Sequence, residues 1–280
     1  MSKIKIITDS SADLPSSLIQ SEKIEVVPLT VRINKKEFVD QQDLSPQQFW
    51  ALSKSSPTLP ETAAPSPGKF LQAYEKAEKD GYRGVICITI SSKLSSTFSS
   101  AVTGSQNFDG SIPITVIDSK NVSIGHGLSV LAASKLSHSE EKIEAIEEKI
   151  KNLIPKTKFF IALDTLENLK KGGRIGNAAA FFGSLLSIKP IISIKDGIVT
   201  AESRQRTRSR SLEYLIKKIK EESPIEDLSI AGAQALDIDN FKNQISNFYD
   251  LSNSIISEVG PVIGAHAGPG AIGVAFHSLK

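Results

Sequence analysis

Short runs of β-branched apolar residues alternate with helix-compatible segments in the first half of the chain. This pattern predicts strands at residues 3–8, 24–33, 85–90 and 114–119. Alternating strands and helices are typical of a mainly parallel sheet that helices cover on both faces. We therefore expect an α/β domain over residues 1–156. The predicted helices of this domain cover residues 10–19, 45–56, 69–79, 127–136 and 140–153, and a further helix follows the strand at 85–90.

Prolines modify this pattern at two places. Pro28 lies inside the strand predicted at 24–33 and favours an edge position or a bend, because proline cannot donate a ladder hydrogen bond. Residues 59–68 contain three prolines and a glycine, which suit neither a helix nor a central strand. We therefore expect a loop at residues 59–68.

Three of the predicted strands end in acidic or hydroxyl residues, namely Asp9-Ser10, Ser91-Ser92 and Asp118-Ser119. The carboxyl ends of parallel strands meet at one edge of a sheet, which is where open α/β sheets bind ligands. We expect these side chains to line one rim. A helix N-cap is the alternative role for Ser91 or Ser92.

The pattern changes after Lys156. Residues 159–163 predict a strand, and residues 191–200 predict an antiparallel hairpin around the Asp196-Gly197 turn. We expect a smaller α+β domain with antiparallel strands over residues 157–280. Its remaining predicted elements are helices near 210–221 and 241–251 and strands at 228–233, 254–259 and 272–277.

Composition narrows the class of protein. The 280 residues are 40% hydrophobic and 23% charged, and 33 basic residues nearly balance 31 acidic ones. A net charge of +2 does not favour a nucleic-acid partner or an anionic membrane surface. The single cysteine, Cys87, lies in an apolar run and is predicted to be a buried structural thiol. No secretory signal and no apolar run of about 20 residues is present, so we expect a cytoplasmic protein.

The common catalytic and cofactor motifs are absent from the sequence or lack their required context. Residues 268–273 match G-x-G-x-x-G, but the seven residues that follow leave no room for a helix and a second strand. No phosphate loop, H-E-x-x-H or G-x-S-x-G motif occurs. The four histidines are scattered along the chain, so we expect neither a metal nor a cofactor.

Two residues in glycine-rich segments are candidates for contact with a ligand head group. His266 has glycines and alanines on both sides, which permits close backbone approach. Its alternative role is structural, with the imidazole bonded to a carbonyl in a tight loop. Arg174 follows Gly172-Gly173 and precedes an apolar run, which suits an anion contact beside an apolar surface. A surface arginine next to a helix cap is its alternative role.

Four arginines occur within residues 204–210. Such a stretch is suited to binding phosphate, RNA or an acidic partner. No aromatic residue interleaves the arginines, and Glu202 and Glu213 flank them. A local phosphate or partner contact is therefore favoured over nucleic acid.

Taken together, five segments resemble the DegV family, whose characterised members are bacterial fatty-acid-binding proteins. The segments occur in the family's order and span nearly the whole chain. They are Asp9 to Leu14, Thr62 to Gly68, Ile90 to Ala101, Lys171 to Ile175 and His266 to Gly273.

The resemblance implies an N-terminal parallel α/β domain, a smaller C-terminal domain, and one long-chain fatty acid between them. It also implies that hydroxyls and a histidine hold the fatty-acid carboxylate. In bacteria with a fatty acid kinase, such proteins present the carboxylate for phosphorylation and carry the acyl-phosphate to phospholipid synthesis. The implied partners are thus the kinase catalytic subunit and an acyltransferase at the membrane surface.

The site residues follow from matching the family's motifs to this chain. The family's Thr-Ser-Gln-Pro segment is Thr62-Ala63-Ala64-Pro65 here, so only the threonine of the polar trio is retained. The Ser-Ser-x-Leu-Ser segment is intact at 91–95. The implied carboxylate ligands are Thr62, Ser92, Ser95 and His266, with Ser91 and Arg174 as further candidates and Arg206 as the kinase or phosphate contact.

Two other expectations remain open from the sequence. The apolar run from Phe181 to Ile188 is predicted to line part of the acyl tunnel. A serine hydrolase or acyltransferase is the alternative function, in which His266 activates Ser92 or Ser95 and Asp9 or Asp118 orients the histidine.

Overall fold

The computed structural model describes residues 3–139, 142–181 and 188–280. A four-stranded parallel sheet in the order β2-β1-β6-β7 forms the centre of the N-terminal half. Its strands are β1 (Ile4–Asp9), β2 (Glu25–Val27), β6 (Gly84–Thr89) and β7 (Ile114–Asp118). The alternation of strands and helices thus correctly predicted a parallel sheet.

Helices cover both faces of this sheet, because its central strands are apolar on both sides. Val85 and Cys87 point toward α3 (Pro67–Lys79) and α4 (Thr97–Gln106). Ile86 and Ile88, which alternate with them, pack with α5 (Ser123–Ser137) and α6 (Ile143–Leu153). Cys87 is fully buried, as its apolar surroundings predicted.

A six-stranded sheet in the order β10-β9-β8-β13-β11-β12 organises the C-terminal half. All its neighbouring strands are antiparallel except β11 and β12, and the predicted hairpin is present as β9 and β10. α8 (Arg208–Glu222) and α9 (Ile238–Ser246) bury their apolar sides on one face. The strands are β8 (Thr157–Ala162), β9 (Lys189–Lys195), β10 (Ile198–Gln205), β11 (Ile225–Gly232), β12 (Ile255–Glu258) and β13 (Ile272–Ser278).

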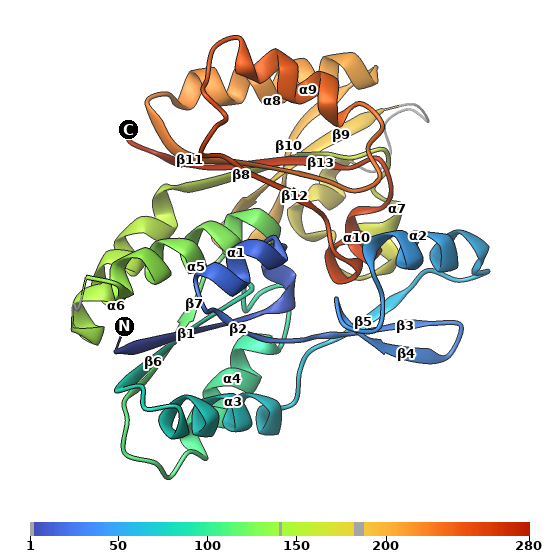
Figure 1. Ribbon diagram of the computed structural model, residues 1–280. Coiled ribbons are helices and arrows are strands. Elements are labelled where there is room, and N and C mark those ends of the chain that lie inside the picture. The colour runs from blue at the N-terminus through green and yellow to red at the C-terminus, as the bar shows by residue number, and fades with distance from the viewer. Residues whose placement is uncertain (1–2, 140–141, 182–187) are drawn as a thin grey trace.

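Figure 1 shows the two sheets stacked with α5 between them. This helix contacts β1 and β6 of the parallel sheet and β8, β11 and β13 of the other sheet. It is buried along almost its whole length, which explains why its sequence is small and apolar rather than amphipathic. The parallel sheet is built from residues before 119 and the six-stranded sheet from residues after 156, and we propose 1–156 and 157–280 as the domains.

The chain around Pro28 differs from the single strand predicted at 24–33. It forms β2 at the edge of the parallel sheet and then β3 (Thr30–Ile33) in a separate antiparallel sheet. Pro28 itself lies outside both strands, where the chain leaves the edge strand β2 and passes into the second sheet, so the expected bend is present. β4 (Lys36–Val39) and β5 (Glu61–Ala63) flank β3, so the predicted loop at 59–68 contains a strand. α2 (Pro46–Ser55) begins with the capping box of Ser45 and Gln48.

Several short helices differ from the elements that the sequence pattern predicts. α10 (Pro261–Ala267) forms where a glycine-rich loop was expected, and Pro261 occupies its first turn, where proline is tolerated. The predicted helix at 10–19 divides into η1 (Ser10–Ala12) and α1 (Ser16–Ser21). The others are α7 (Glu167–Lys171) and the 3₁₀ turns η2 (Ile154–Lys156) and η3 (Gly176–Phe181).

A buried carboxyl fixes the start of α10 against the N-terminal half. The Gly260 N–H donates to Oδ1 of Asp13 over 2.9 Å, and the Ser123 hydroxyl donates to Oδ2 over 2.5 Å. Burial raises the pKa of Asp13 to about 8, although both hydrogen bonds favour the ionised form. This bridge joins η1, α5 and α10, and α10 carries His266.

Candidate functional site

An apolar cavity of about 330 Å³ lies between the carboxyl edge of the parallel sheet and one face of the six-stranded sheet. This volume falls within the range of about 300–1,000 Å³ that is usual for small-molecule sites. Residues of α10 and of the segment around β5 line further sides of the cavity. Its lining consists of Leu29, Thr62, Ala63, Ala64, Ile90, Leu94, Ser95, Ser96, Val122, Phe159, Ile161, Leu163, Leu169, Arg174, Ile192, Ile194, Val199, Val262, Ile263, His266 and Ala267.

The apolar wall of the cavity follows from strand alternation. Phe159 and Ile161 of β8 point into the cavity, as does Leu163 just after the strand. Phe160 and Ala162, which alternate with them, face the opposite cluster beneath α8 and α9. One face of β8 therefore supplies the cavity, while the other supplies the core.

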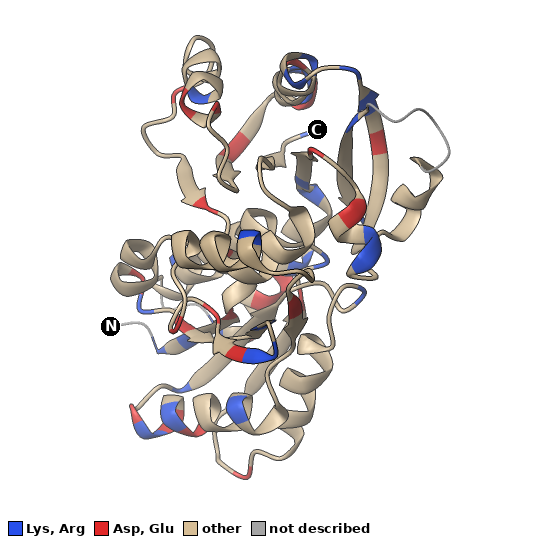
Figure 2. Cartoon of the chain, turned by 90° about the vertical axis from the view of Figure 1, so that its right-hand side faces the viewer, with Lys and Arg blue, Asp and Glu red and all other residues tan. Residues whose placement is uncertain are grey.

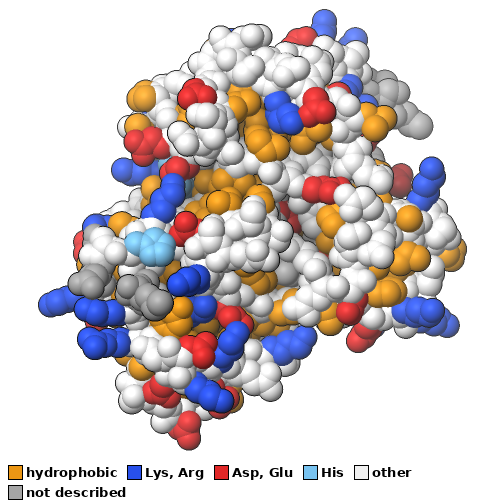
Figure 3. Space-filling view, viewed as in Figure 1, with side chains coloured by type: hydrophobic (Ala, Val, Ile, Leu, Met, Phe, Trp, Pro, Cys, Tyr) orange, Lys and Arg blue, Asp and Glu red, His pale blue; other side chains and the backbone are white. Residues whose placement is uncertain are grey.

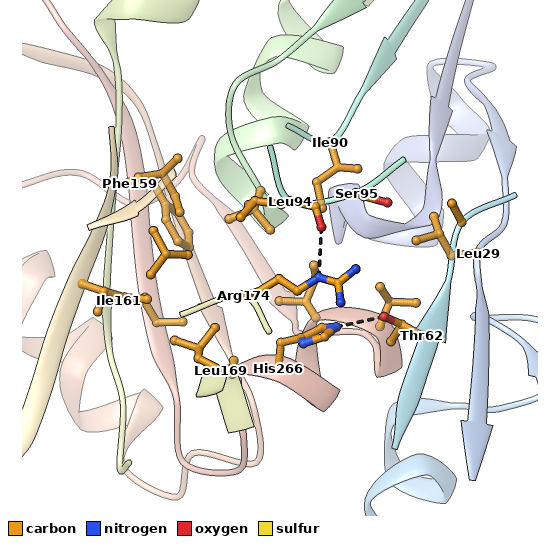
Figure 4. A pocket seen from close by; sticks show the side chains of 18 of the residues that line it. Leu29, Thr62, Ile90, Leu94, Ser95, Phe159, Ile161, Leu169, Arg174 and His266 are labelled. Atoms are coloured by element: carbon orange, nitrogen blue, oxygen red, sulfur yellow. Dashed lines mark hydrogen bonds between the residues drawn. The ribbon is translucent and has the colours of Figure 1, made fainter. Parts of the chain in front are cut away.

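Thr62 and His266 form the polar end of the cavity (Figure 4). The Thr62 hydroxyl lies 2.9 Å from Nε2 of His266. Burial, with a smaller contribution from the nearby Arg174 charge, lowers the pKa of His266 to about 4. The imidazole is therefore neutral near pH 7, and its buried Nδ1 atom has no hydrogen-bond partner among the residues that the structure describes.

Gly172 allows the chain to approach the His266 ring. A Cβ placed on Gly172 would lie 2.4 Å from Nδ1 of His266, a distance that real Cβ atoms do not reach. Any larger residue at position 172 would therefore move the imidazole or the end of α7. The glycine pair before Arg174 was singled out in the sequence, but its packing against His266 was not predicted.

Arg174 brings a positive charge to the same end of the cavity. Its Nε donates to the Leu94 carbonyl over 3.1 Å, and its Nη1 donates to the Gly172 carbonyl over 2.8 Å. The side chain is half-buried and lines the cavity. These bonds hold the guanidinium across the gap between the two halves of the chain (Figure 4).

The serine segment after β6 divides between the cavity and the rim. Ser95 lines the cavity, and its hydroxyl shares a 2.8 Å hydrogen bond with the hydroxyl of Thr97. Ser92 is exposed and is not among the lining residues, because its hydroxyl donates to Asp118 over 2.5 Å. Ser91 is buried and donates to the Gly197 carbonyl over 2.8 Å. The structure thus brings Ser95 to the cavity but directs Ser91 and Ser92 elsewhere.

The acidic residues that end the strands lie along one edge of the parallel sheet, as the pattern predicted, but their roles are structural. Oδ2 of Asp9 accepts the Ile90 N–H over 2.8 Å, and Asp118 accepts the Ser92 N–H as well as its hydroxyl. Among the described residues, no hydrogen bond joins His266 to Ser92 or Ser95. The hydroxyl that contacts the histidine belongs to Thr62, so the relay expected of a serine hydrolase is not assembled.

The arginine-rich stretch lies at the end of β10 and the start of α8. Arg208 forms a two-point ion pair with Asp237, and Arg204 stacks over the Phe181 ring at 4.6 Å. Arg206 is exposed. Basic and acidic residues are interspersed along the chain and on the face seen in Figure 3, so the charge pattern does not resemble a nucleic-acid-binding stripe (Figures 2 and 3).

One further expectation concerns the wall of the cavity. Of the apolar run at 181–188, residues 182–187 lie outside the described residues, and Phe181 packs against the cluster that surrounds the cavity.

No group of three or more His, Cys, Asp or Glu side chains within 3–139, 142–181 and 188–280 is arranged to hold a metal ion. In the described part of the chain, no helix is both long and apolar enough to cross a membrane.

Comparison with known proteins decides the family. A family model described as "Uncharacterised protein, DegV family" matches residues 3–279. The chain belongs to the DegV family. A DegV domain-containing protein of Listeria monocytogenes is 34% identical over 281 residues, which cover 99% of this chain and all of the relative. The similarity therefore extends over both halves of the protein.

Solved DegV structures share the fold described above. A DegV protein of Thermus thermophilus, described by its fatty acid binding, is 31% identical with a TM-score of 0.90, and the match covers all of both chains. A fatty-acid-binding DegV protein of Streptococcus agalactiae is 28% identical with a TM-score of 0.90 and the same coverage. DegV of Bacillus subtilis, also described as a fatty-acid-binding protein, is 28% identical with a TM-score of 0.87, over 99% of this chain and 100% of that chain.

Proposed function

We propose that this protein binds one long-chain fatty acid, with its acyl chain in the apolar cavity and its carboxylate beside Thr62, His266 and Arg174. The observation that carries the proposal is the composition of the cavity, which is apolar except at one end. A fatty acid has the same division between an apolar chain and one charged group. The fatty acid binding of similar DegV proteins supports this assignment.

The acyl chain supplies most of the binding free energy in this proposal. Each methylene that leaves water contributes about 0.8 kcal/mol. A buried carboxylate loses its hydration, and this cost is offset only where hydrogen-bond donors or a cation meet it. The half-buried guanidinium of Arg174 supplies the positive charge, and the hydroxyls of Thr62 and Ser95 supply donors.

The neutral imidazole of His266 orients the Thr62 hydroxyl. With its proton on Nε2, His266 donates to Oγ1 of Thr62, and the Thr62 proton is then free to point at a carboxylate oxygen. The lowered pKa of His266 keeps the free site from carrying a second fixed charge next to Arg174. In this role the histidine acts through the threonine.

The proposal extends to a partner. The protein presents the bound carboxylate to a fatty acid kinase catalytic subunit and carries the acyl-phosphate to an acyltransferase for phospholipid synthesis in the cytoplasm. Exposed Arg206 is the proposed contact with the kinase or its phosphate. In this proposal the protein itself is a non-catalytic carrier that needs no cofactor. The hydrogen bonds of His266, Ser92 and Ser95 to other partners argue against a serine hydrolase.

The proposal is tested by the lipid that accompanies the purified full-length protein. Native mass spectrometry is expected to show one fatty acid per chain, or uptake of one oleate or palmitate after removal of lipid. A protein that neither carries nor takes up a fatty acid would contradict it.

A further inference from the structure

Phe159 and Ile194 line two separate hollows of the molecule. One is the apolar cavity, and the other is an outer cleft of about 770 Å³. Because both residues belong to both linings, they form a shared wall between the two spaces. The lining of the outer cleft includes the charged residues Asp118, Lys120, Lys151, Lys158, Lys195 and Asp196.

The position of this wall follows from strand pairing. Phe160 pairs with Ser193 in the β8–β9 register, and Phe159 and Ile194 come one residue before and one residue after that pair. They therefore lie opposite each other at the end of the register. Figure 4 shows Phe159 across the cavity from Thr62. The wall is thus on the side of the cavity away from the polar end.

Gly273 of β13 provides the surface on which the Phe159 ring rests. A Cβ on Gly273 would lie 3.3 Å from Cε2 and 3.4 Å from Cζ of Phe159. Phe159 pairs with Ala275, so Gly273 is a diagonal neighbour on the same face of the sheet. The ring is only 3% exposed and fills the space above the glycine. Phe159 is therefore a fixed wall.

We propose that Phe159 sets the longest acyl chain that this protein holds, because its ring stops the methyl end of the chain. This inference rests on the proposed function and adds a specificity-determining residue to it. A chain that reaches the ring has filled the apolar cavity. A longer chain must displace a packed aromatic ring or fold back within the cavity.

The energetics predict a sharp upper limit. Each further methylene buried before the wall strengthens binding about fourfold. A chain that passes the wall in the native protein must displace the Phe159 ring, and its end enters a cleft lined in part by charged side chains, where the methylenes leave water only in part. Affinity in the native protein therefore rises with chain length up to the wall and then falls.

Removing the ring changes both the chain length that binds best and the fall in affinity beyond that length. In Phe159→Ala, the vacated volume connects the cavity with the outer cleft, so the best-bound chain becomes longer by at least two methylenes. Beyond that length the affinity reaches a plateau, since the end of the chain projects into the open cleft. Phe159→Trp, with a larger ring, shifts the optimum toward shorter chains.

The experiment offers the lipid-free, full-length protein an equimolar mixture of myristate, palmitate, stearate, arachidate and behenate. Native mass spectrometry then measures which acids are bound. The matched control is Phe160→Ala, because Phe160 is adjacent, equally aromatic and buried, but faces the opposite cluster. The control is expected to keep the native profile, while Phe159→Ala shifts its optimum to longer chains.

An unchanged profile in Phe159→Ala, or an equal shift in Phe160→Ala, would overturn the inference while the native protein still binds fatty acid. Absence of binding in the native protein would instead contradict the proposed function. If Phe159→Ala does not fold, Phe159→Leu serves as the test, since it shortens the wall and retains most of its apolar contact. A native profile in a folded Phe159→Leu would likewise overturn the inference.

Discussion

The Thr62 hydroxyl lies 2.9 Å from Nε2 of His266, although 204 residues separate them in the chain. Thr62 comes from β5, and His266 comes from the last turn of α10. Their contact therefore exists only when the small sheet of the N-terminal half is packed against α10. It places the polar end of the cavity at a junction of distant segments.

Removing the Thr62 hydroxyl should weaken fatty-acid binding. Thr62→Val keeps the side-chain shape but loses the donor, and a hydrogen bond to a charged group contributes about 1.5–3 kcal/mol. We expect at least about a tenfold rise in Kd, measured by displacement of a fluorescent fatty acid. Thr30→Val on the neighbouring strand β3 is the control, since Thr30 does not line the cavity. Equal affinity in native protein and Thr62→Val would exclude this role.

His266 should make the stability of the lipid-free protein depend on pH. Its pKa is about 4 in the folded protein and about 6.5 when unfolded. As the pH falls from 6.5 to 4, the unfolded chain therefore binds a proton that the folded protein excludes. The free energy of unfolding falls by roughly 3 kcal/mol at most. The His266→Asn variant has no imidazole to protonate, so we expect its free energy of unfolding to lack this decrease. Urea unfolding across this pH range measures the difference between the two proteins.

Comparing the native protein with His266→Asn also separates the contribution of His266 to the pH dependence of stability from that of a buried carboxyl. Asp13 has a raised pKa of about 8, so it favours the folded state at low pH and opposes the effect of the histidine. Both proteins contain Asp13, and its contribution cancels in their difference. Parallel pH profiles for native protein and His266→Asn would show that burial does not shift His266 as described.

Local patterns predicted the scaffold well because local physics determines it. The apolar strand at 85–90 is buried on both faces, which requires a parallel sheet with helices on each side, and the half-buried strand at 114–119 forms the edge of that sheet. The Asp196-Gly197 turn likewise encodes its hairpin. β5 was missed because prolines flank its three residues, and α10 was missed because its short sequence contains proline, glycine and alanine; tertiary packing stabilises both.

The structure places only some of the candidate site residues at the cavity. Thr62, Ser95, Arg174 and His266 line it, whereas Ser92 does not. The sequence of 91–95 contains no signal that separates these serines, because the direction of each hydroxyl depends on Asp118 of β7. The alternation at 159–163 predicts that β8 has two different faces. Which face lines the cavity follows only from the packing of the parallel sheet against the six-stranded sheet.

The two serines should differ in their effect on binding. Ser95→Ala removes a hydroxyl at the cavity, and we expect Kd to rise about threefold to tenfold. Ser92→Ala should leave Kd unchanged, because this hydroxyl bonds to Asp118. Neither residue should be labelled by a fluorophosphonate in the folded protein. Stoichiometric labelling that is lost in Ser92→Ala or Ser95→Ala would identify a serine hydrolase.

Arg206 should affect the partner and not the lipid. Arg206→Glu reverses an exposed charge outside the cavity lining, so fatty-acid affinity should stay within twofold of the native value, or about 0.4 kcal/mol. Acyl-phosphate formation with a fatty acid kinase and ATP should fall at least about tenfold. Arg210→Glu, at another exposed arginine of the same stretch, tests whether the position matters. Unchanged phosphorylation in Arg206→Glu would exclude this contact.

Identification of the bound lipid tests the central claim most directly. The full-length protein is purified without detergent, its mass is measured under native conditions, and the released lipid is identified after denaturation. We expect one long-chain fatty acid per chain, with reduced retention in His266→Ala that remains folded. A lipid-free protein that takes up neither oleate nor palmitate would contradict the account.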